Sequence, residues 1–314
     1  MLGAERYAAT RINLAQACNG VGWILGPIVG SMFFYGVDET GASTGSQMLY
    51  IPYVGVAIGV LVLAALFAMA PMPDIKTPDH YHLDDASGTE STKSIWAHPH
   101  FVMAVVAQFF YVAAQAGIFS FFINYMVEET PAITAGLNER FNSFAASCPG
   151  FLQSWLSGWT ETVDGALRIT EKGAANMVSL GAIFFLLGRV IGALLLKRYS
   201  SHSLLGIYGA LNVLACLVVI GKFGWWSAAA VFATYFLMSI MFPTIFAMGI
   251  HGLGSRAKQA SAYLVMAIMG GAVLPKLMGA IADKYDMSRG FILPLVCFAI
   301  VAAYGFMWPK LVKA

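Results

Sequence analysis

Long apolar runs alternate with shorter polar connections along most of the chain. A helix that crosses the hydrocarbon core of a bilayer needs about 20 mostly apolar residues. Eight runs meet this requirement, and they cover about Leu14–Gly36, Leu49–Ala70, Phe101–Met126, Ala174–Leu196, Ser203–Ile220, Ser227–Ile250, Ala260–Ala282 and Phe291–Trp308. The pattern therefore predicts an all-α integral membrane protein with about eight transmembrane helices.

The composition agrees with a membrane protein and argues against several other classes. Hydrophobic residues make up 59% of the chain and charged residues 11%, whereas soluble domains average about 45–50% and about 25%. A formal net charge of +2 is too small to indicate binding to nucleic acid. The cysteines form no CxxC or Cys/His pattern and the histidines no HExxH pattern, so we expect no metal site, no cofactor and no enzyme activity.

The basic residues of the connections indicate the orientation of the chain. Lys and Arg in short connections mark the cytoplasmic side of a membrane protein. One side of the predicted bundle carries Arg6, Arg11, Lys76, Lys93, Lys197, Arg198, Arg256, Lys258, Lys310 and Lys313. The short loops of the other side carry only Lys222, Lys284 and Arg289. We therefore expect a multi-pass protein of the plasma (inner) membrane with both termini in the cytoplasm.

The first of two long connections divides the chain into segments. The stretch Pro71–Pro99 is polar, rich in Pro, Asp, His, Ser and Thr, and carries both signs of charge. Such a composition is typical of a flexible linker. We therefore expect a two-span segment at residues 1–71, a cytoplasmic linker at residues 72–99 and a six-helix half at residues 100–314.

The second long connection, residues 131–173, lies on the external side of the predicted bundle. Its apolar stretches around Trp155 and Trp159 predict one short amphipathic helix at the membrane interface, where tryptophan is favoured. A simple inserted loop explains this connection, and a protein-binding cap is the alternative.

Polar side chains recur on one face of the predicted helix Phe101–Met126. Gln108, Tyr111 and Gln115 are spaced i, i+3 and i+7, which places them on the same side of an α-helix. Asn124 lies about half a turn away and joins this face only if the helix is distorted. Because buried amides and phenols need partners, the stripe favours a water-filled cavity that binds hydroxyl-rich ligands such as sugars. Hydrogen bonding between helices is the alternative.

The first predicted span has a similar polar face. Gln16 and Asn19 are three residues apart and lie deep enough in the apolar run to face a cavity. Asn13 shares this face but lies near the membrane surface. Hydrogen bonding between packed helices explains Gln16 and Asn19 as well as ligand binding does.

Charged residues inside a span are costly and usually functional. No Asp or Glu lies in the middle of a predicted span, and only Arg189 and Lys276 lie inside apolar runs. Gly188 and Gly192 flank Arg189 and permit close helix packing, so these three residues are candidates for a gating or structural role. A structural ion pair or a snorkelling side chain is the alternative for Arg189, and snorkelling explains Lys276.

Two predicted spans contain residues that interrupt helices. Pro243 lacks a backbone N–H, and Gly270 and Gly271 are followed by Pro275. Broken helices recur at the binding sites and gates of transporters, which makes these positions candidates for gating. Proline and glycine are also common in ordinary transmembrane helices, so a purely structural role stays open.

Four stretches of the chain, in the same order, resemble one transporter family. They are RINLAQACNGVGWILGP (Arg11–Pro27), AQFFYVAAQAGIFSFFINY (Ala107–Tyr125), SIMFPTIFAMGIHGLG (Ser239–Gly254) and SAYLVMAIMGGAVLPKLMG (Ser261–Gly279). The family is that of the L-fucose permeases and glucose/galactose transporters, in the major facilitator superfamily. The resemblance covers the chain except for its two long connections. It implies a partial major facilitator superfamily fold, equivalent to spans five to twelve of twelve, with the linker between the two halves.

The resemblance also implies roles for particular residues. A sugar contact or a place in the cavity lining is implied for Asn19, Gln16, Gln108, Tyr111 and Gln115. The sequence around Arg189 is similar to a basic helix-end motif that acts as a conformational latch. Phe242 stands where the family often has tyrosine, so one hydroxyl contact is lost. The family's acidic residues on spans one and four have no counterpart in the chain.

These observations predict a sugar transporter for a monosaccharide such as fucose, glucose or galactose, in a truncated or incomplete chain. The family implies symport with protons, which would require the acidic residues that the chain lacks. The expected partners are a small sugar, the lipid bilayer and, through the family, protons. A non-transporting membrane protein that binds sugar or acts as a receptor is the alternative.

Overall fold

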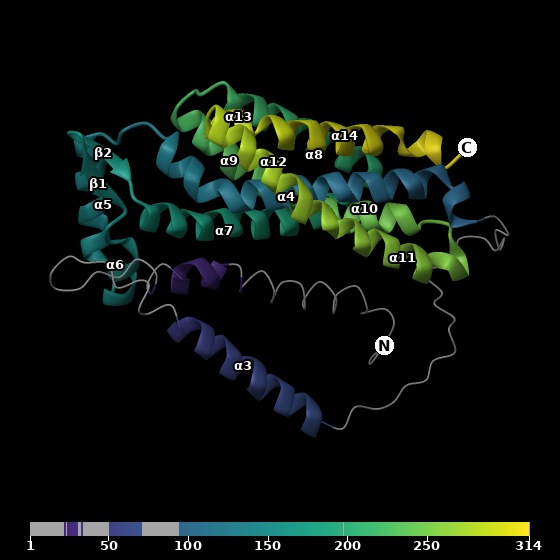
Figure 1. Ribbon diagram of the computed structural model, residues 1–314, viewed down its shortest axis with the longest axis horizontal. Coiled ribbons are helices and arrows are strands. Elements are labelled where there is room, and N and C mark those ends of the chain that lie inside the picture. Colours follow the sequence, from purple (N-terminus) through teal and green to yellow (C-terminus); the bar gives the residue numbers. More distant parts are fainter. Residues whose placement is uncertain are drawn as a thin grey trace. The chain divides into compact units, whose positions relative to one another are not determined.

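The computed structural model describes residues 22, 24–30, 33, 50–70, 94–196 and 198–313, which are mostly helical (Figure 1). Within these residues, seven helical segments are long and apolar enough to cross a membrane. This confirms the expected multi-pass, all-α architecture. The first expected span, Leu14–Gly36, lies largely outside the described residues.

The seven candidate spans begin and end close to the predicted limits. They are Tyr50–Met69 (α3), Pro99–Glu128 (α4), Glu171–Leu196 (α7), Ser201–Ile220 (α8), Trp225–Ile250 (α9 and α10), Ala257–Lys284 (α11, η4 and α12) and Met287–Leu311 (α13 and α14). Two short 3₁₀ turns precede α4 and α11, namely η2 (Ile95–Ala97) and η3 (Gly254–Arg256). The apolar runs locate these elements because a spanning segment must satisfy its backbone hydrogen bonds internally, which a helix does.

Three spans are discontinuous, and two of the interruptions fall at predicted weak points. Their parts are α9 (Trp225–Met238), α10 (Met241–Ile250), α11 (Ala257–Met266), η4 (Ala267–Met269), α12 (Gly270–Lys284), α13 (Met287–Gly290) and α14 (Ile292–Leu311). The break between α9 and α10 lies just before Pro243, and α12 begins at Gly270. Pro275 lies inside α12 without ending it.

The connection predicted to be external, residues 131–173, is more structured than the single short helix that we predicted. It contains two helices and two antiparallel strands: α5 (Ala135–Ser147), α6 (Gly150–Leu156), β1 (Thr160–Val163) and β2 (Ala166–Ile169). Asp164 and Gly165 join the strands with φ angles of 52° and 77°, as a two-residue hairpin turn requires. The predicted short helix around Trp155 is present as α6, but the prediction missed α5 and the hairpin because it followed the apolar residues and overlooked this Asp-Gly turn signal.

The chain divides into two compact units, the first of which comprises Met1–Asp79 and Ala132–Ala182. Within this unit, Nε1 of Trp159 donates to the carbonyl of Trp155 at 2.9 Å, and Nδ2 of Asn176 donates to the same carbonyl at 2.8 Å. The two tryptophan rings meet edge to face, with centroids 5.7 Å apart. Hydrogen bonds therefore attach the external connection to the first turns of α7.

The second compact unit comprises His80–Pro131 and Ile183–Ala314. α4 lies at its centre, with α10, α12 and α14 packed against it, and α8 packs against α9 and α14 (Figure 1). α8 and α14 approach closely because a Cβ on Gly305 would lie 2.5 Å from the backbone nitrogen of Gly206. Only glycine allows such a contact, which is a usual way for membrane helices to pack tightly.

Candidate functional site

The polar residues of α4 differ in burial. Gln108 and Tyr111 are each 0% exposed, Gln115 is partly buried and Asn124 is exposed. Asn124 thus lies apart from the stripe, as its angular position on the helix predicts. Gln115 is the member of the stripe that a ligand can reach without entering the packed interior of the second unit.

Gln108 is buried without hydrogen-bond partners. Neither its Nε2 nor its Oε1 atom has a partner among the described residues. An unsatisfied buried polar group costs about 1–3 kcal/mol, and such groups are rare in native proteins. The amide can donate and accept hydrogen bonds, so it matches the requirements of a water molecule or a sugar hydroxyl.

Tyr111 uses its hydroxyl inside the second unit. The hydroxyl donates to the carbonyl of Met238, the last residue of α9, at 3.0 Å. The ring lies edge-on to that of Phe242, with centroids 6.4 Å apart. These contacts tie α4 to the break between α9 and α10, and they leave the phenol engaged by the protein.

Arg189 reaches the same break from α7. Its Nε donates to the carbonyl of Ser239 at 3.4 Å, and its guanidinium lies 5.2 Å from the centroid of the Phe185 ring. The side chain is therefore held by the polypeptide backbone and by an aromatic face. The structure brings together Arg189, Tyr111 and the Pro243 break, which were separate candidates in the sequence.

Glycines let α7 lie directly against the break. A Cβ on Gly188 would collide with the carbonyl oxygen of Phe236, and a Cβ on Gly192 would collide with the side chain of Ile240. The predicted close packing at these two positions is thus present. It brings the backbone of α7 so close to the broken span that Nε of Arg189 reaches the carbonyl of Ser239.

A second pair of glycines brings α12 close to α4. A Cβ on Gly270 would collide with the carbonyl oxygen of Phe109, and a Cβ on Gly271 would lie 3.2 Å from the Cβ of Ala116. Small residues are therefore required where this interrupted span crosses α4. Gln16 and Asn19, the remaining candidates, lie outside the described residues.

No protein-family model matches the chain, but named transporters resemble it along nearly its whole length. The chain is 28% identical to the glucose/galactose transporter of Brucella abortus biovar 1 (strain 9-941) over 99% of its length. It is also 28% identical to the L-fucose-proton symporter of Escherichia coli (strain K12) over 97% of its length. The chain spans 66% and 65%, respectively, of the lengths of these relatives.

A solved structure matches nearly the whole chain. It is the crystal structure of a major facilitator superfamily transporter, FucP, in the outward conformation, with a TM-score of 0.63 and 27% identity, and the match covers 98% of this chain and 70% of that chain. The chain is therefore similar, in sequence and in fold, to L-fucose and glucose/galactose transporters of the major facilitator superfamily. These similarities agree with the resemblance that the four sequence motifs indicated.

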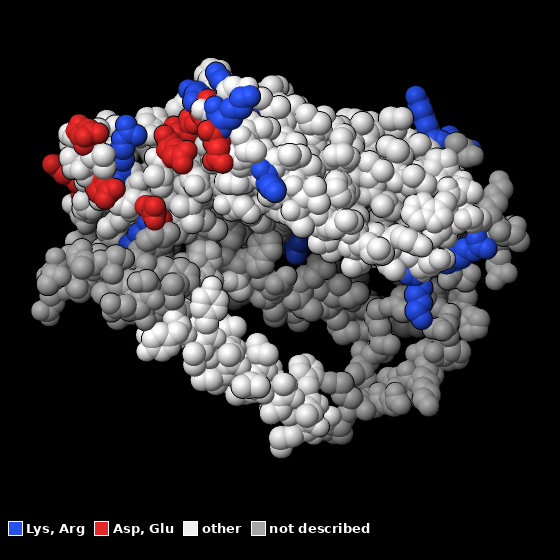
Figure 2. All heavy atoms as spheres, in the orientation of Figure 1, with Lys and Arg blue, Asp and Glu red and all other residues white. Residues whose placement is uncertain are grey.

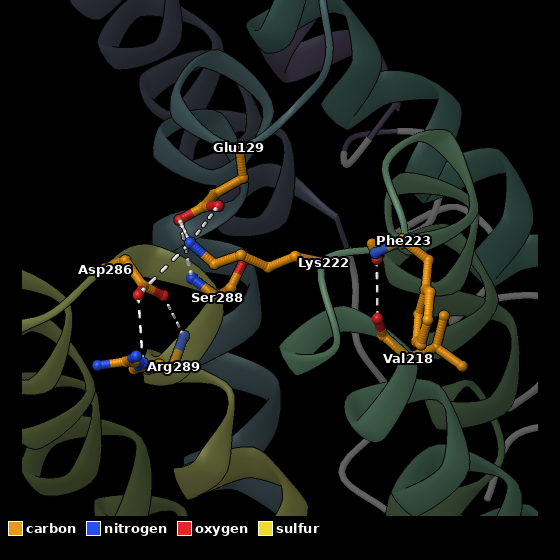
Figure 3. Close-up of polar contacts among 8 residues, drawn as sticks. Glu129, Val218, Lys222, Phe223, Asp286, Ser288 and Arg289 are labelled. Carbon is orange, nitrogen blue, oxygen red and sulfur yellow. Dashed lines mark hydrogen bonds and ion pairs between the residues drawn. The ribbon is translucent and has the colours of Figure 1, made fainter.

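A charged cluster that we did not predict lies at one end of the second unit (Figure 3). Nζ of Lys222 lies 3.1 Å from Oε2 of Glu129 and 3.4 Å from Oδ2 of Asp286. Nε of Arg289 lies 3.3 Å from Oδ2 of Asp286, and the N–H of Ser288 donates to Glu129 at 3.3 Å. These five residues, the end cluster, join α4, the α8–α9 turn and α13. The sequence did contain a signal for this cluster, because residues of opposite charge occur in connections on the same side of the predicted bundle.

Lys222 adopts an unusual backbone conformation within the end cluster. Its φ angle is 55°, which is uncommon for a residue other than glycine. Partial burial alone lowers the pKa of Lys222, but its hydrogen bond with Glu129 and the charges of Glu129 and Asp286 outweigh this effect, so the pKa is raised. The ammonium group therefore stays charged at neutral pH.

Charged side chains gather at the two ends of the second unit and leave a largely uncharged band between them (Figure 2). The acidic residues described in this unit all belong to the end that holds the end cluster: Glu128, Glu129, Asp283 and Asp286. The opposite end carries Arg198, Arg256, Lys258, Lys310 and Lys313. The unit thus has one end of mixed charge and one whose described charges are all basic.

Proposed function

We propose that the chain transports a monosaccharide such as fucose, glucose or galactose across the membrane; symport with protons, which the names of its relatives imply, would require acidic residues that its predicted spans lack. The observation that carries this proposal is the match of 98% of the chain to the outward-conformation structure of FucP. A second matching structure is that of the E. coli fucose:proton symporter. Relatives named as glucose/galactose transporters extend the set of candidate sugars.

In this proposal the sugar contacts Gln115 on α4, with Gln16 and Asn19 on the first predicted span as further contacts. The unpartnered amide atoms of Gln108 support a polar environment along the same stripe. Tyr111 contributes its ring to the wall of the site and not its hydroxyl, because the hydroxyl already donates to the protein backbone. Asn124 contributes least because it lies on a different face of the helix.

The proposal includes an orientation in the plasma (inner) membrane with both termini in the cytoplasm. The end of the second unit that carries Arg198, Arg256 and Lys258 then faces the cytoplasm, which agrees with the preference of basic residues for that side. Residues 100–314 form the C-terminal half of the transporter, and residues 72–99 form the linker that precedes it.

Uptake by vesicles that contain the full chain tests the proposal. The vesicles are supplied with radiolabelled L-fucose, D-glucose or D-galactose, with and without an inward proton gradient. We expect uptake of at least one sugar and at least a fivefold lower uptake for Gln115→Ala, and an increase of uptake by the gradient would show coupling to protons. Gln259→Ala is the matched control because Gln259 is exposed on α11, and it should leave uptake unchanged.

Two results would contradict the proposal. Absence of uptake for all three sugars, at a verified amount of inserted protein, would rule out transport of these substrates. Saturable sugar binding without uptake would replace transport by a binding or receptor function. Equal uptake by the Gln115→Ala and Gln259→Ala variants would remove Gln115 from the site and leave transport itself in place.

A further inference from the structure

The break between α9 and α10 leaves a backbone carbonyl without its normal partner. In an uninterrupted helix, the N–H of residue 243 would donate to the carbonyl of Ser239, but Pro243 has no N–H. Regular helical bonding resumes when the N–H of Thr244 donates to the carbonyl of Ile240 at 3.1 Å. The carbonyl of Ser239 therefore needs a donor from elsewhere, since an unsatisfied carbonyl is strongly unfavourable within a membrane.

Side chains from two other helices donate to this segment. Nε of Arg189, on α7, donates to the carbonyl of Ser239 at 3.4 Å. The hydroxyl of Tyr111, on α4, donates to the preceding carbonyl, that of Met238, at 3.0 Å. Tyr111, Met238 and Ser239 are fully buried, so water has little access to compete for these carbonyls.

The packing of α7 favours this role for Arg189. The glycines before and after it bring the α7 backbone against the break, as the collisions of a Cβ at Gly188 and at Gly192 show. The hydroxyl of Ser239 donates to the carbonyl of Phe236 at 2.7 Å, within its own helix. This hydroxyl therefore does not replace the donor that the carbonyl of Ser239 lacks, and the carbonyl accepts from Arg189 instead.

We infer that Arg189 replaces the backbone donor that Pro243 removes, that Tyr111 supplies a donor to the neighbouring carbonyl of Met238, and that this pair sets the geometry of the broken span. Arg189 is then a positioning residue for the transport cycle, and its hydrogen bond matters more than its charge. The inference rests on the proposed function only where transport rates are concerned. It differs from a charge-based latch because it couples Arg189 to Pro243.

The test is a double-mutant cycle on the full chain in detergent, read as the midpoint temperature of unfolding. Arg189→Leu removes the donor, and Pro243→Ala restores the missing N–H at position 243. We expect Arg189→Leu to lower the midpoint in the wild-type background and to lower it by less than half as much in the Pro243→Ala background. Arg198→Leu, at an exposed site just beyond α7, is the control and should have the same effect in both backgrounds.

A second variant separates the hydrogen bond from the charge. Arg189→Gln removes the charge, but it places an amide nitrogen at the same number of bonds from the Cα as the Nε of arginine. We expect Arg189→Gln to recover most of the midpoint that Arg189→Leu loses. In vesicles, Arg189→Leu should lower the maximal uptake rate at least fivefold and change KM less than twofold.

Several outcomes would overturn the inference. Equal losses for Arg189→Leu in both backgrounds would show that Arg189 and Pro243 act independently. Equal defects for the Gln and Leu variants would assign the effect to charge. If Arg189→Leu fails to fold, recovery of a folded chain by adding Pro243→Ala supports the inference, and failure to recover it overturns the inference. The unfolding cycle gives its answer even if no sugar is transported, so failure of the inference and failure of the proposed function are distinguishable.

Discussion

The end cluster allows a quantitative prediction for Lys222→Met. This substitution keeps most of the side-chain length and removes the ammonium group that lies 3.1 Å from Glu129 and 3.4 Å from Asp286. We expect it to lower the free energy of unfolding by about 1–2 kcal/mol, more than for an average surface ion pair.

The magnitude follows from the exposure and the distances. The Lys222 side chain is 48% exposed, so solvent screens both pairs, and each attraction is about 1.3 kcal/mol at the dielectric constant of water. Fixing a long side chain offsets part of the sum. Two effects act in the other direction: the Glu129 side chain is only 11% exposed, and without the cation it would lie near the carboxylate of Asp286, which Arg289 neutralises only in part.

The assay is thermal unfolding of the full chain in detergent at low salt. The expected loss corresponds to roughly 2–8 °C in Tm for a protein of this size. Lys284→Met is the control: Lys284 carries the same charge nearby but lies over the Tyr285 ring. At about 1 M salt the screening length falls to about 3 Å, and the difference between the two variants should shrink. Equal Tm values for both variants at low salt would refute the reasoning.

The raised pKa of Lys222 predicts how this contribution depends on pH. Because the folded protein binds this proton more tightly than the unfolded chain does, the stabilisation is fully present below the ordinary lysine pKa of about 10.4. It is lost as the pH rises through the raised pKa of the folded state. The difference between wild type and Lys222→Met should therefore be constant from about pH 7 to 9 and decrease above about pH 10.4. A decrease on acidification within that range would contradict this assignment.

Two further substitutions test the packing of the second unit by thermal unfolding. Gly188→Ala places a Cβ against the carbonyl oxygen of Phe236 and should destabilise the chain by about 1–3 kcal/mol; Gly136→Ala, where a Cβ meets nothing within 4 Å, is the control, and equal effects would refute the close approach of α7. Asn212 is fully buried and neither polar atom of its side chain has a partner among the described residues, so Asn212→Leu should stabilise the chain by about 1 kcal/mol. A lower Tm for that variant would mean that the amide binds a group that is not yet identified.

The hydrophobic pattern alone located the spanning helices because lipid leaves the backbone few alternatives. A segment without water must bond to itself, so run length was enough to predict α4 or α8 within a few residues. The break before Pro243 has a separate cause, the backbone N–H that proline lacks, although Pro275 lies inside α12 without ending it. No comparable constraint acts on the external connection, where the hairpin at Asp164 and Gly165 depended on a local turn signal that the apolar residues obscured.

Helical periodicity also determined that Gln108, Tyr111 and Gln115 share a face of α4. It could not determine what each of them meets, because the angle of a residue around its own helix carries no information about the neighbouring helices. Only the tertiary structure showed that Gln108 is enclosed, that Tyr111 donates to α9 and that Gln115 is accessible.

The end cluster and the contact of Arg189 with Ser239 likewise separate what the sequence predicts from what only the tertiary structure reveals. The sequence by itself indicated the resemblance to the transporter family, and it determined the spans and the positions of the charges and helix breakers, since these are local properties of the chain. The tertiary structure decided the pairings of Lys222 with Glu129 and of Arg189 with Ser239. Such pairings join residues that are far apart in the chain, and they form only when helix packing brings their elements together.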